Sequence, residues 1–216
     1  MAIRRVYGSL DSPNTLKVLA AMFEHDIDFE FVPIDIEAGE NKRPEFLSMS
    51  PFGQIPVYED GPIRQFECRG VVRSTAHEYA HRKPAGQEII CWEARKQALI
   101  ANWIDVEDLK FEPAVLAVLN DNNPAAMADN HHHHQSAEAN LCKVLDVYEA
   151  QLKKHKYLVM DKFTAADLLH LPNLQTLKDN PTTRSLVDAR PRVSAWADEI
   201  LTRPSWVKVV NMIKGC

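Results

Sequence analysis

Residues 51–69 read PFGQIPVYEDGPIRQFECR and organise the first part of the chain. The centre of this stretch predicts a β-hairpin, because the turn dipeptide Asp60-Gly61 separates two runs, 55–58 and 63–66, of strand-forming residues. Pro56 opens the first strand, and the Ile55–Pro56 bond is a candidate for the cis isomer. A proline there can also present the backbone edge of the preceding residue to a ligand.

Two polar residues, Glu67 and Cys68, follow the second strand directly, and a helix-compatible run extends from 69 to 81. A chain that leaves a strand and enters a helix carries unpaired N–H groups at the helix start, where a carboxylate binds well. The stretch therefore predicts a small binding lip, with main-chain hydrogen bonds on one side and an anion pocket on the other.

The composition is that of an ordinary globular protein, with 45% hydrophobic and 25% charged residues among 216. A net charge of -5 argues against a nucleic-acid or anionic-membrane partner. No apolar run reaches the ~20 residues that a membrane-spanning helix needs, and no secretory signal is expected. Four scattered cysteines (Cys68, Cys91, Cys142 and Cys216) fit a reducing compartment. We expect a soluble cytosolic protein.

The first 82 residues predict a small mixed sheet with helices. Short strands are expected at 4–7 and 28–31, and 34–49 is polar and irregular. Ser12 and Pro13 form a strong helix start, with serine as the N-cap and proline at the first helical position. The order βαβ and then ββα is thioredoxin-like in outline. Residues 83–89 predict a linker, since Pro84 and Gly86 interrupt the pattern.

Residues 90–216 predict an all-helical domain. One helix face is expected to carry Trp92, Leu99, Trp103 and Val106, and we expect Trp92, Trp103 and Trp196 to be core aromatics. An apolar stripe at helical spacing comprises Leu141, Val144, Leu145, Tyr148 and Leu152.

Three further helix signals follow along the chain. Thr164 and Asp167 predict a capping box, and Pro172, inside the helix that follows this box, predicts a kink or local break there. Another amphipathic helix carries Val193, Trp196, Ala197 and Ile200, and Pro204 is expected to begin the last helix.

The residues of this chain resemble the cytosolic glutathione transferases, most closely the plant phi class. The resemblance lies in 50–56 (SPFGQIP) and 66–69 (FECR), and it continues through 103–107 (WIDVE), 143–150 (KVLDVYEA), 163–168 (FTAADL) and 190–196 (RPRVSAW). It implies a thioredoxin-like glutathione-binding domain (1–82) and an all-helical domain (90–216). It also implies a homodimer, with an acceptor pocket between the two domains of each subunit.

The resemblance places the catalytic serine at Ser12. A thiol attacks only as the thiolate, and a hydroxyl donor at a helix N-terminus lowers the thiol pKa. The residues alone favour a plain N-cap, but the two roles are compatible. The resemblance further implies a glutathione cradle formed by Asn41, Lys42, Gln54, Ile55, Glu67 and Cys68. In it, Gln54 and Ile55 bind through the main chain, Glu67 pairs with the γ-glutamyl amine, the Cys68 N–H binds the γ-glutamyl carboxylate, and Lys42 faces the glycyl carboxylate.

Three residues depart from the family pattern, and all three predict weaker activity. Cys68 stands where serine is usual, and a thiol is a weak hydrogen-bond donor. Asn41 stands where histidine is common, which removes a cation from the glycyl end. Asp11 puts a carboxylate beside Ser12, which opposes thiolate formation unless it points to solvent or caps the helix.

Two other groups of residues have alternative interpretations. The resemblance assigns the acceptor pocket to Pro13, Phe111, Val115, Val118 and Leu119, although core packing explains the last four almost as well. The run His131–His134 can bind a metal adventitiously, but its polar surroundings favour a solvated loop between helices.

The expected activity is conjugation of glutathione to hydrophobic electrophiles, with hydroperoxides as a further class of acceptor. No metal is expected. The alternative is a non-catalytic ligandin, which binds flavonoids, hormones or other apolar molecules in the same fold and carries them.

Overall fold

The computed structural model describes residues 4–121 and 131–215, and for residue 121 and residues 131–135 it describes the backbone alone. The chain forms two compact units, Met1–Ile90 together with Thr202–Cys216, and Cys91–Leu201. The first is called the sheet unit and the second the helical unit. Within the described residues, no helix is both long and apolar enough to cross a membrane.

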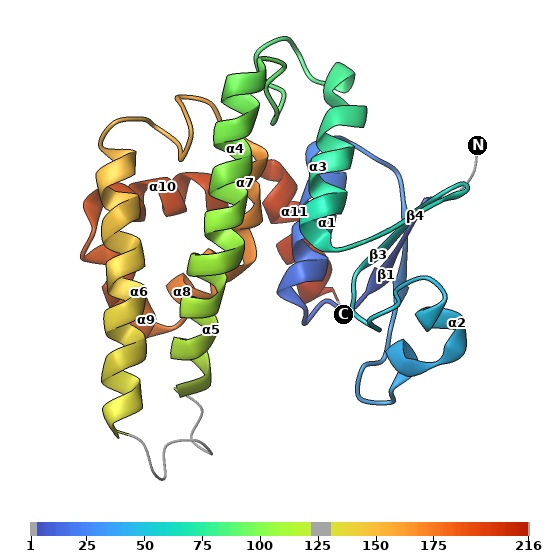
Figure 1. Ribbon diagram of the computed structural model, residues 1–216, viewed down its shortest axis with the longest axis horizontal. Coiled ribbons are helices and arrows are strands. Elements are labelled where there is room, and N and C mark those ends of the chain that lie inside the picture. Colours follow the sequence, from blue (N-terminus) through green and yellow to red (C-terminus); the bar gives the residue numbers. More distant parts are fainter. Residues whose placement is uncertain (1–3, 122–130, 216) are drawn as a thin grey trace. The chain divides into compact units, whose positions relative to one another are not determined.

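The sheet unit comprises β1 (Arg5–Gly8), α1 (Pro13–Glu24), β2 (Glu30–Pro33), η1 (Glu40–Lys42), α2 (Pro44–Leu47), β3 (Val57–Asp60), β4 (Ile63–Phe66), α3 (Cys68–Glu78), η2 (Ala80–Arg82) and α11 (Pro204–Lys214). The strand order is β2-β1-β3-β4 (Figure 1). Strand β1 is parallel to β2 and antiparallel to β3, and β3 is antiparallel to β4. The thioredoxin-like sheet and the hairpin expected from the sequence are confirmed, as is the cis bond between Ile55 and Pro56.

Helix α1 packs against α3 and α11, and its position on the sheet depends on a glycine. A Cβ atom on Gly8, at the end of β1, would lie 2.5 Å from Oγ1 of Thr15 in the first turn of α1. Real Cβ atoms do not approach this closely, so only glycine lets the start of α1 lie against the strand. In the region expected to be irregular, η1 and α2 are short helices, and Pro44 begins the second of them.

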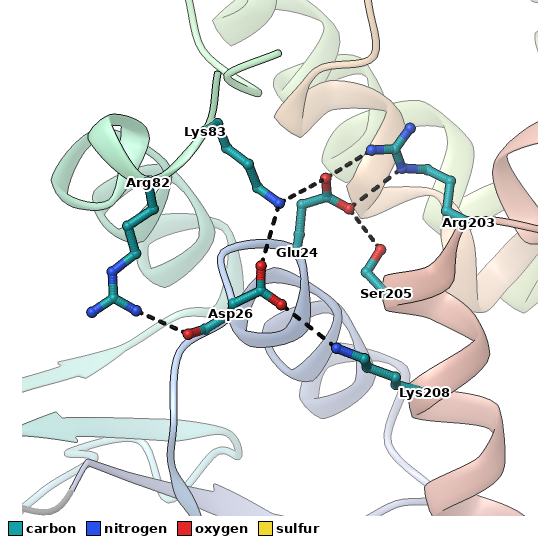
Figure 2. A network of polar contacts seen from close by, with 7 residues as sticks. All are labelled: Glu24, Asp26, Arg82, Lys83, Arg203, Ser205 and Lys208. Atoms are coloured by element: carbon teal, nitrogen blue, oxygen red, sulfur yellow. Dashed lines mark hydrogen bonds and ion pairs between the residues drawn. The ribbon is translucent and has the colours of Figure 1, made fainter. Parts of the chain in front are cut away.

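A buried carboxylate joins α1 to α11. Glu24, in the last turn of α1, has 6% of its surface exposed and accepts from Arg203 Nη2 at 2.7 Å and from the Ser205 hydroxyl at 2.6 Å (Figure 2). Lys83 Nζ lies 3.8 Å from the same carboxylate. Because a buried charge is costly unless it is paired and hydrogen-bonded, these partners hold the two helix ends together.

A second carboxylate, that of Asp26, lies in the turn after α1. Its oxygens are 3.9 Å from Lys83 Nζ and 3.6 Å from Lys208 Nζ, and its main-chain carbonyl accepts from Arg82 at 2.9 Å (Figure 2). These exposed contacts are weaker than those of Glu24, since water screens them.

Helix α11 thus belongs to the sheet unit, whereas the expected boundary at residue 90 places it in the helical domain.

The helical unit comprises α4 (Ala94–Val106), the π-helical turn η3 (Glu107–Phe111), α5 (Glu112–Asp121), α6 (His131–Leu152), α7 (Ala165–Leu169), α8 (Leu171–Asp179), α9 (Pro181–Asp188) and α10 (Pro191–Leu201). Helices α5 and α6 lie side by side (Figure 1). The break at Pro172 is confirmed, because α7 ends before it and α8 begins around it. Residues 131–134, expected in a loop, instead form the backbone of the first turn of α6.

The core of the helical unit is aromatic and polar. Tyr148 is fully buried, and its hydroxyl lies 2.9 Å from Nε2 of His170, which packs against Trp196 at 5.4 Å between ring centroids. The capping box is confirmed: Asp167 accepts from the N–H and hydroxyl of Thr164, both at 2.9 Å. Asp167 also accepts from Trp196 Nε1 at 3.0 Å, and burial raises the pKa of this carboxyl group.

The expected apolar face of α4 is partly wrong. Trp92 precedes the helix and is 71% exposed, and Leu99 is 49% exposed. Ile100 and Ile104 face the core instead. Because the helix begins at Ala94, the periodicity that linked Trp92 to Trp103 did not belong to one helix.

His25, at the end of α1, generates a prediction about acid stability. Its side chain is fully buried, and neither ring nitrogen has a hydrogen-bond partner among the described residues. Burial lowers the pKa of His25 from 6.5 to about 4. Between pH 6.5 and pH 4, the unfolded chain therefore binds a proton at this histidine that the folded chain does not bind. The folded state loses stability as the pH falls through this range.

We expect His25→Phe to remove ~3 kcal/mol of the difference in unfolding free energy between pH 7 and pH 4, because the variant no longer has the group whose pKa burial lowers to about 4. Urea unfolding at both pH values measures this difference. His77→Gln is the control for the loss of a histidine at an exposed position. An equal loss of stability on acidification in wild type and His25→Phe would contradict the assignment.

Candidate active site

Ser12 is the N-cap of α1, as expected. Its backbone is extended, its hydroxyl oxygen accepts from the Thr15 N–H at 3.4 Å, and Pro13 occupies the first turn. No acceptor for the hydroxyl hydrogen lies within the described part of the chain, and the side chain is half-buried. The hydroxyl can therefore cap the helix with its oxygen and still donate its hydrogen to a bound group. The positive end of the helix dipole favours an anion at the same place.

Asp11 is exposed, and its carboxylate accepts from the Ser9 hydroxyl at 3.4 Å. The Ser9 hydroxyl in turn accepts from the Asp11 N–H at 3.2 Å. Asp11 thus forms a local turn with Ser9 and does not cap α1. Water around its carboxylate screens the like charge that it would impose on a thiolate.

Asn41 and Lys42, in η1, lie against the loop that precedes the hairpin. The buried Asn41 amide donates to the Gly53 carbonyl at 2.8 Å, and Lys42 Nζ lies 3.4 Å from the same oxygen. Gly53 has a φ of +61°, and a Cβ there would lie 2.8 Å from the Asn41 carbonyl oxygen. Asn41 therefore holds the loop, whereas Lys42 is exposed and available at its rim.

Ser50 orders the main chain of this loop. Its hydroxyl donates to the Gln54 carbonyl at 2.8 Å and accepts from the Gln54 N–H at 3.1 Å. Gln54 was expected to bind through its main chain, but its N–H is already committed to Ser50. The main-chain groups of Ile55, within the described residues, have no partner.

Glu67 and Cys68 begin α3. Glu67 is the N-cap residue but makes no side-chain cap, and its exposed carboxylate has no partner in the part of the chain that the structure describes. Its φ of +69° is unusual for a residue with a side chain, and such strain concentrates at functional sites. Cys68 is buried, and its thiol donates to Asn14 Oδ1 at 3.3 Å.

These contacts bring four segments of the sheet unit together. The contact between Asn14 and Cys68 joins the first turns of α1 and α3. The pairing of Val57 with Phe66 puts the Ile55–Pro56 bond beside the start of α3. Asn14 and Ser50 were not singled out from the sequence. The signal for each was local: Asn14 lies two residues after the N-cap, and Ser50 directly precedes the Pro51 turn.

The residues expected to line the acceptor pocket differ in their burial. Phe111, Val115 and Val118 have no exposed surface, and the Phe111 ring packs 4.8 Å from His170 within the helical unit. Core packing therefore accounts for these three. Leu119 and Pro13 are half-buried. Among the described residues, no group of three or more His, Cys, Asp or Glu side chains could hold a metal ion, and the side chains of residues 131–134 lie outside this description.

Two family models match the chain. The glutathione S-transferase N-terminal domain matches residues 4–84, and the glutathione S-transferase C-terminal domain matches residues 108–204. Together they cover both the strands of the sheet unit and most of the helical unit.

Named relatives cover nearly the whole chain. Glutathione S-transferase PARB of Nicotiana tabacum is 42% identical over 99% of this chain and 100% of its own. Glutathione S-transferase F7 of Arabidopsis thaliana is 38% identical over 97% and 100%. The crystal structure of poplar glutathione transferase F1 has a TM-score of 0.91 at 32% identity, with 100% of both chains covered.

A second solved structure, maize glutathione S-transferase I in complex with an atrazine glutathione conjugate, has a TM-score of 0.86 at 33% identity and covers 99% of each chain. The identity to the plant F-class relatives extends through both units, so it does not rest on the short motifs alone. The chain belongs to the glutathione S-transferase family, in the plant phi class.

Proposed function

We propose that this protein binds glutathione in the sheet unit and conjugates its thiolate to hydrophobic electrophiles, with Ser12 as the catalytic residue. The observation that carries the proposal is the Ser12 hydroxyl, whose oxygen caps α1 while its hydrogen has no acceptor in the described chain. Glutathione brings a thiol whose pKa is about 8.5, so the thiol is mostly protonated at neutral pH. A hydrogen bond from Ser12 to the sulfur favours the charged form.

The reaction then needs no metal. The thiol proton leaves to solvent, and the sulfur anion forms a bond to an electrophilic carbon. With an aryl halide, the carbon–halogen bond breaks and the halide departs with the electron pair. With an activated alkene, the carbanion takes a proton from solvent.

The cradle uses the geometry of the four converging segments. Ile55 offers its main-chain groups to the cysteinyl part of glutathione, and the unpaired Glu67 carboxylate offers a partner to the γ-glutamyl ammonium. The start of α3 at Cys68 favours the γ-glutamyl carboxylate, since the first N–H groups of a helix have no partner inside it. Lys42 faces the glycyl carboxylate, and Asn41 supports the loop.

The ligandin alternative has less support, because a carrier needs neither the donor at Ser12 nor the free carboxylate of Glu67. We place the protein in the cytosol. The three described cysteines are free, which supports a reducing compartment.

A homodimer is also proposed, and an exposed aromatic pair supports it. Phe52 is 67% exposed and Phe66 is 37% exposed, and their rings contact each other at 6.3 Å between centroids. Aromatic side chains of this kind are enriched in protein interfaces, whereas a monomer gains nothing from exposing them.

Ser12→Ala should reduce kcat/KM with a chloronitroaryl acceptor by ~10²–10³, the typical effect of losing one donor to a developing or bound anion. The pKa of enzyme-bound glutathione, followed by ultraviolet absorbance of the thiolate, should rise to the value in buffer. Ser12→Thr keeps both the cap and the hydroxyl and should retain most activity. Ser9→Ala, which removes a neighbouring hydroxyl, is the control. Equal activity of wild type and Ser12→Ala would overturn the mechanism, and dye binding without any turnover would favour the ligandin.

Cys68→Ser should lower the dissociation constant of glutathione by about tenfold, since a hydroxyl is a better donor to a carboxylate than a thiol is. Calorimetric titration measures this constant. Cys68→Ala is the matched control, because it removes the thiol without supplying a donor and should bring no gain. If serine and alanine had the same effect, the side chain at this position would not contact the ligand.

Phe52→Ser should convert the dimer to a monomer, as read from the molar mass by light scattering after size-exclusion chromatography. Val147→Ser changes a comparably exposed apolar residue of α6, 59% exposed, and should leave the mass unchanged. A dimer that survives Phe52→Ser at micromolar concentration would exclude this surface as the main interface.

A further inference from the structure

A cavity of about 360 Å³ lies within the helical unit, apart from the residues of the glutathione site. It is bounded by the end of α6, the segment that follows, and one side of α10. Its apolar wall includes Leu152, Ala195 and Trp196. A volume of this size is in the range of small-ligand sites.

The charges around this cavity are unbalanced. Four lining residues carry a full positive charge (Lys153, Lys154, Lys156 and Arg192), and two carry a negative charge (Asp161 and Glu199). Among the lining residues the excess is two positive charges, and it is one when Glu149, whose carboxylate lies 3.9 Å from Lys153 Nζ, is included, in a chain whose net charge is -5. A concave surface of one sign attracts ligands of the other sign against the field of the whole protein.

Both acidic residues of the cavity are already engaged. Glu199 accepts from Lys156 Nζ at 2.8 Å and from the Tyr157 hydroxyl at 2.5 Å. Asp161 accepts from the Lys156 N–H at 2.8 Å. By contrast, the side chains of Lys154 and Arg192 have no hydrogen-bond or ion-pair partner within the described residues. The cations left over are therefore those that a bound anion would meet.

The rim of the cavity is held in place before any ligand arrives. Gln151 Nε2 donates to the Leu158 carbonyl at 2.8 Å, and the Leu158 N–H donates to the buried Asp167 at 3.0 Å. At the start of α10, Glu149 accepts from the Arg192 N–H at 2.9 Å and so fixes the first turn of that helix. A preformed rim reduces the ordering cost that binding would otherwise pay.

The helix dipole offers a simpler explanation for part of this pattern. Lys153 and Lys154 follow α6, where cations offset the negative end of the helix dipole. That explanation does not extend to Arg192, which lies at the start of α10, the end of a helix where the dipole disfavours a cation. Two elements thus contribute cations to the cavity, and the helix dipole explains the cations of only one of these elements.

We propose that this basic cavity binds a small organic or inorganic polyanion, one that presents at least two carboxylate or phosphate groups to Lys154 and Arg192. The site is separate from the glutathione cradle, which lies in the sheet unit. It belongs to the helical unit alone and does not depend on the proposed catalytic role of Ser12.

The test is calorimetric titration of the full chain with citrate and with inorganic pyrophosphate at low ionic strength, with glycerol as the uncharged comparison. We expect binding of both anions, none of glycerol, and weakening as salt is added. Lys154→Gln and Arg192→Gln should each weaken binding by about fivefold, the effect of losing one partly exposed charge pair. Glu199→Gln, which releases Lys156 from its partner, should tighten it.

Lys143→Gln is the matched control, because it removes the same charge from an exposed position on α6, outside the cavity lining. It should leave the dissociation constants unchanged. Equal weakening by Lys143→Gln and Lys154→Gln would show diffuse attraction rather than a site, and it would overturn the proposal, as would absence of binding in the wild type. Transferase turnover should be the same in Lys154→Gln and wild type, so failure of this site and failure of the catalytic assignment give different results.

Discussion

The proposed active site depends on two helices of the sheet unit whose first turns are in contact. The first turns of α1 and α3 are joined by the contact between Asn14 and Cys68, at 3.3 Å. Each helix start carries N–H groups without partners inside the helix and the positive end of a dipole. Bringing two such ends together creates a region that favours negative charge, and Arg69 adds a cation in the first turn of α3. A tripeptide with a carboxylate at each end and an ionisable thiol in the middle is the ligand that we propose for that region.

The departures from the family pattern have different structural consequences. Asp11 is turned towards Ser9 and exposed to water, so its charge is screened from the N-cap. Asn41 is buried and donates to the Gly53 carbonyl, so it supports the loop. Having asparagine here in place of the histidine common in the family therefore affects the loop more than the ligand. Cys68 lies at the helix start where we propose that the ligand carboxylate binds, and its buried thiol donates to Asn14.

A buried carboxylate stabilises each of the two units. The buried Glu24 is bonded to Arg203 and Ser205, and it secures α11 to the sheet unit although more than a hundred residues separate them in the chain. Asp167 has the same role in the helical unit, where donors from Thr164, Leu158 and Trp196 converge on it. In both units, a carboxylate removed from water is stabilised by several donors at once, as a buried charge requires.

Sequence patterns were sufficient wherever the determining interaction is local. The hairpin, the N-cap at Ser12, the capping box at Thr164 and the break at Pro172 each depend on residues within a few positions of one another, and all were predicted. The resemblance to the transferases supplied the proposed roles of Ser12, Glu67 and Cys68. Only the tertiary structure decided which neighbours already occupy the main chain of Gln54, which side of α4 faces the core, and that α11 packs with the first ninety residues. These outcomes depend on contacts between distant segments, where burial and hydrogen bonding choose among arrangements that the local pattern permits equally.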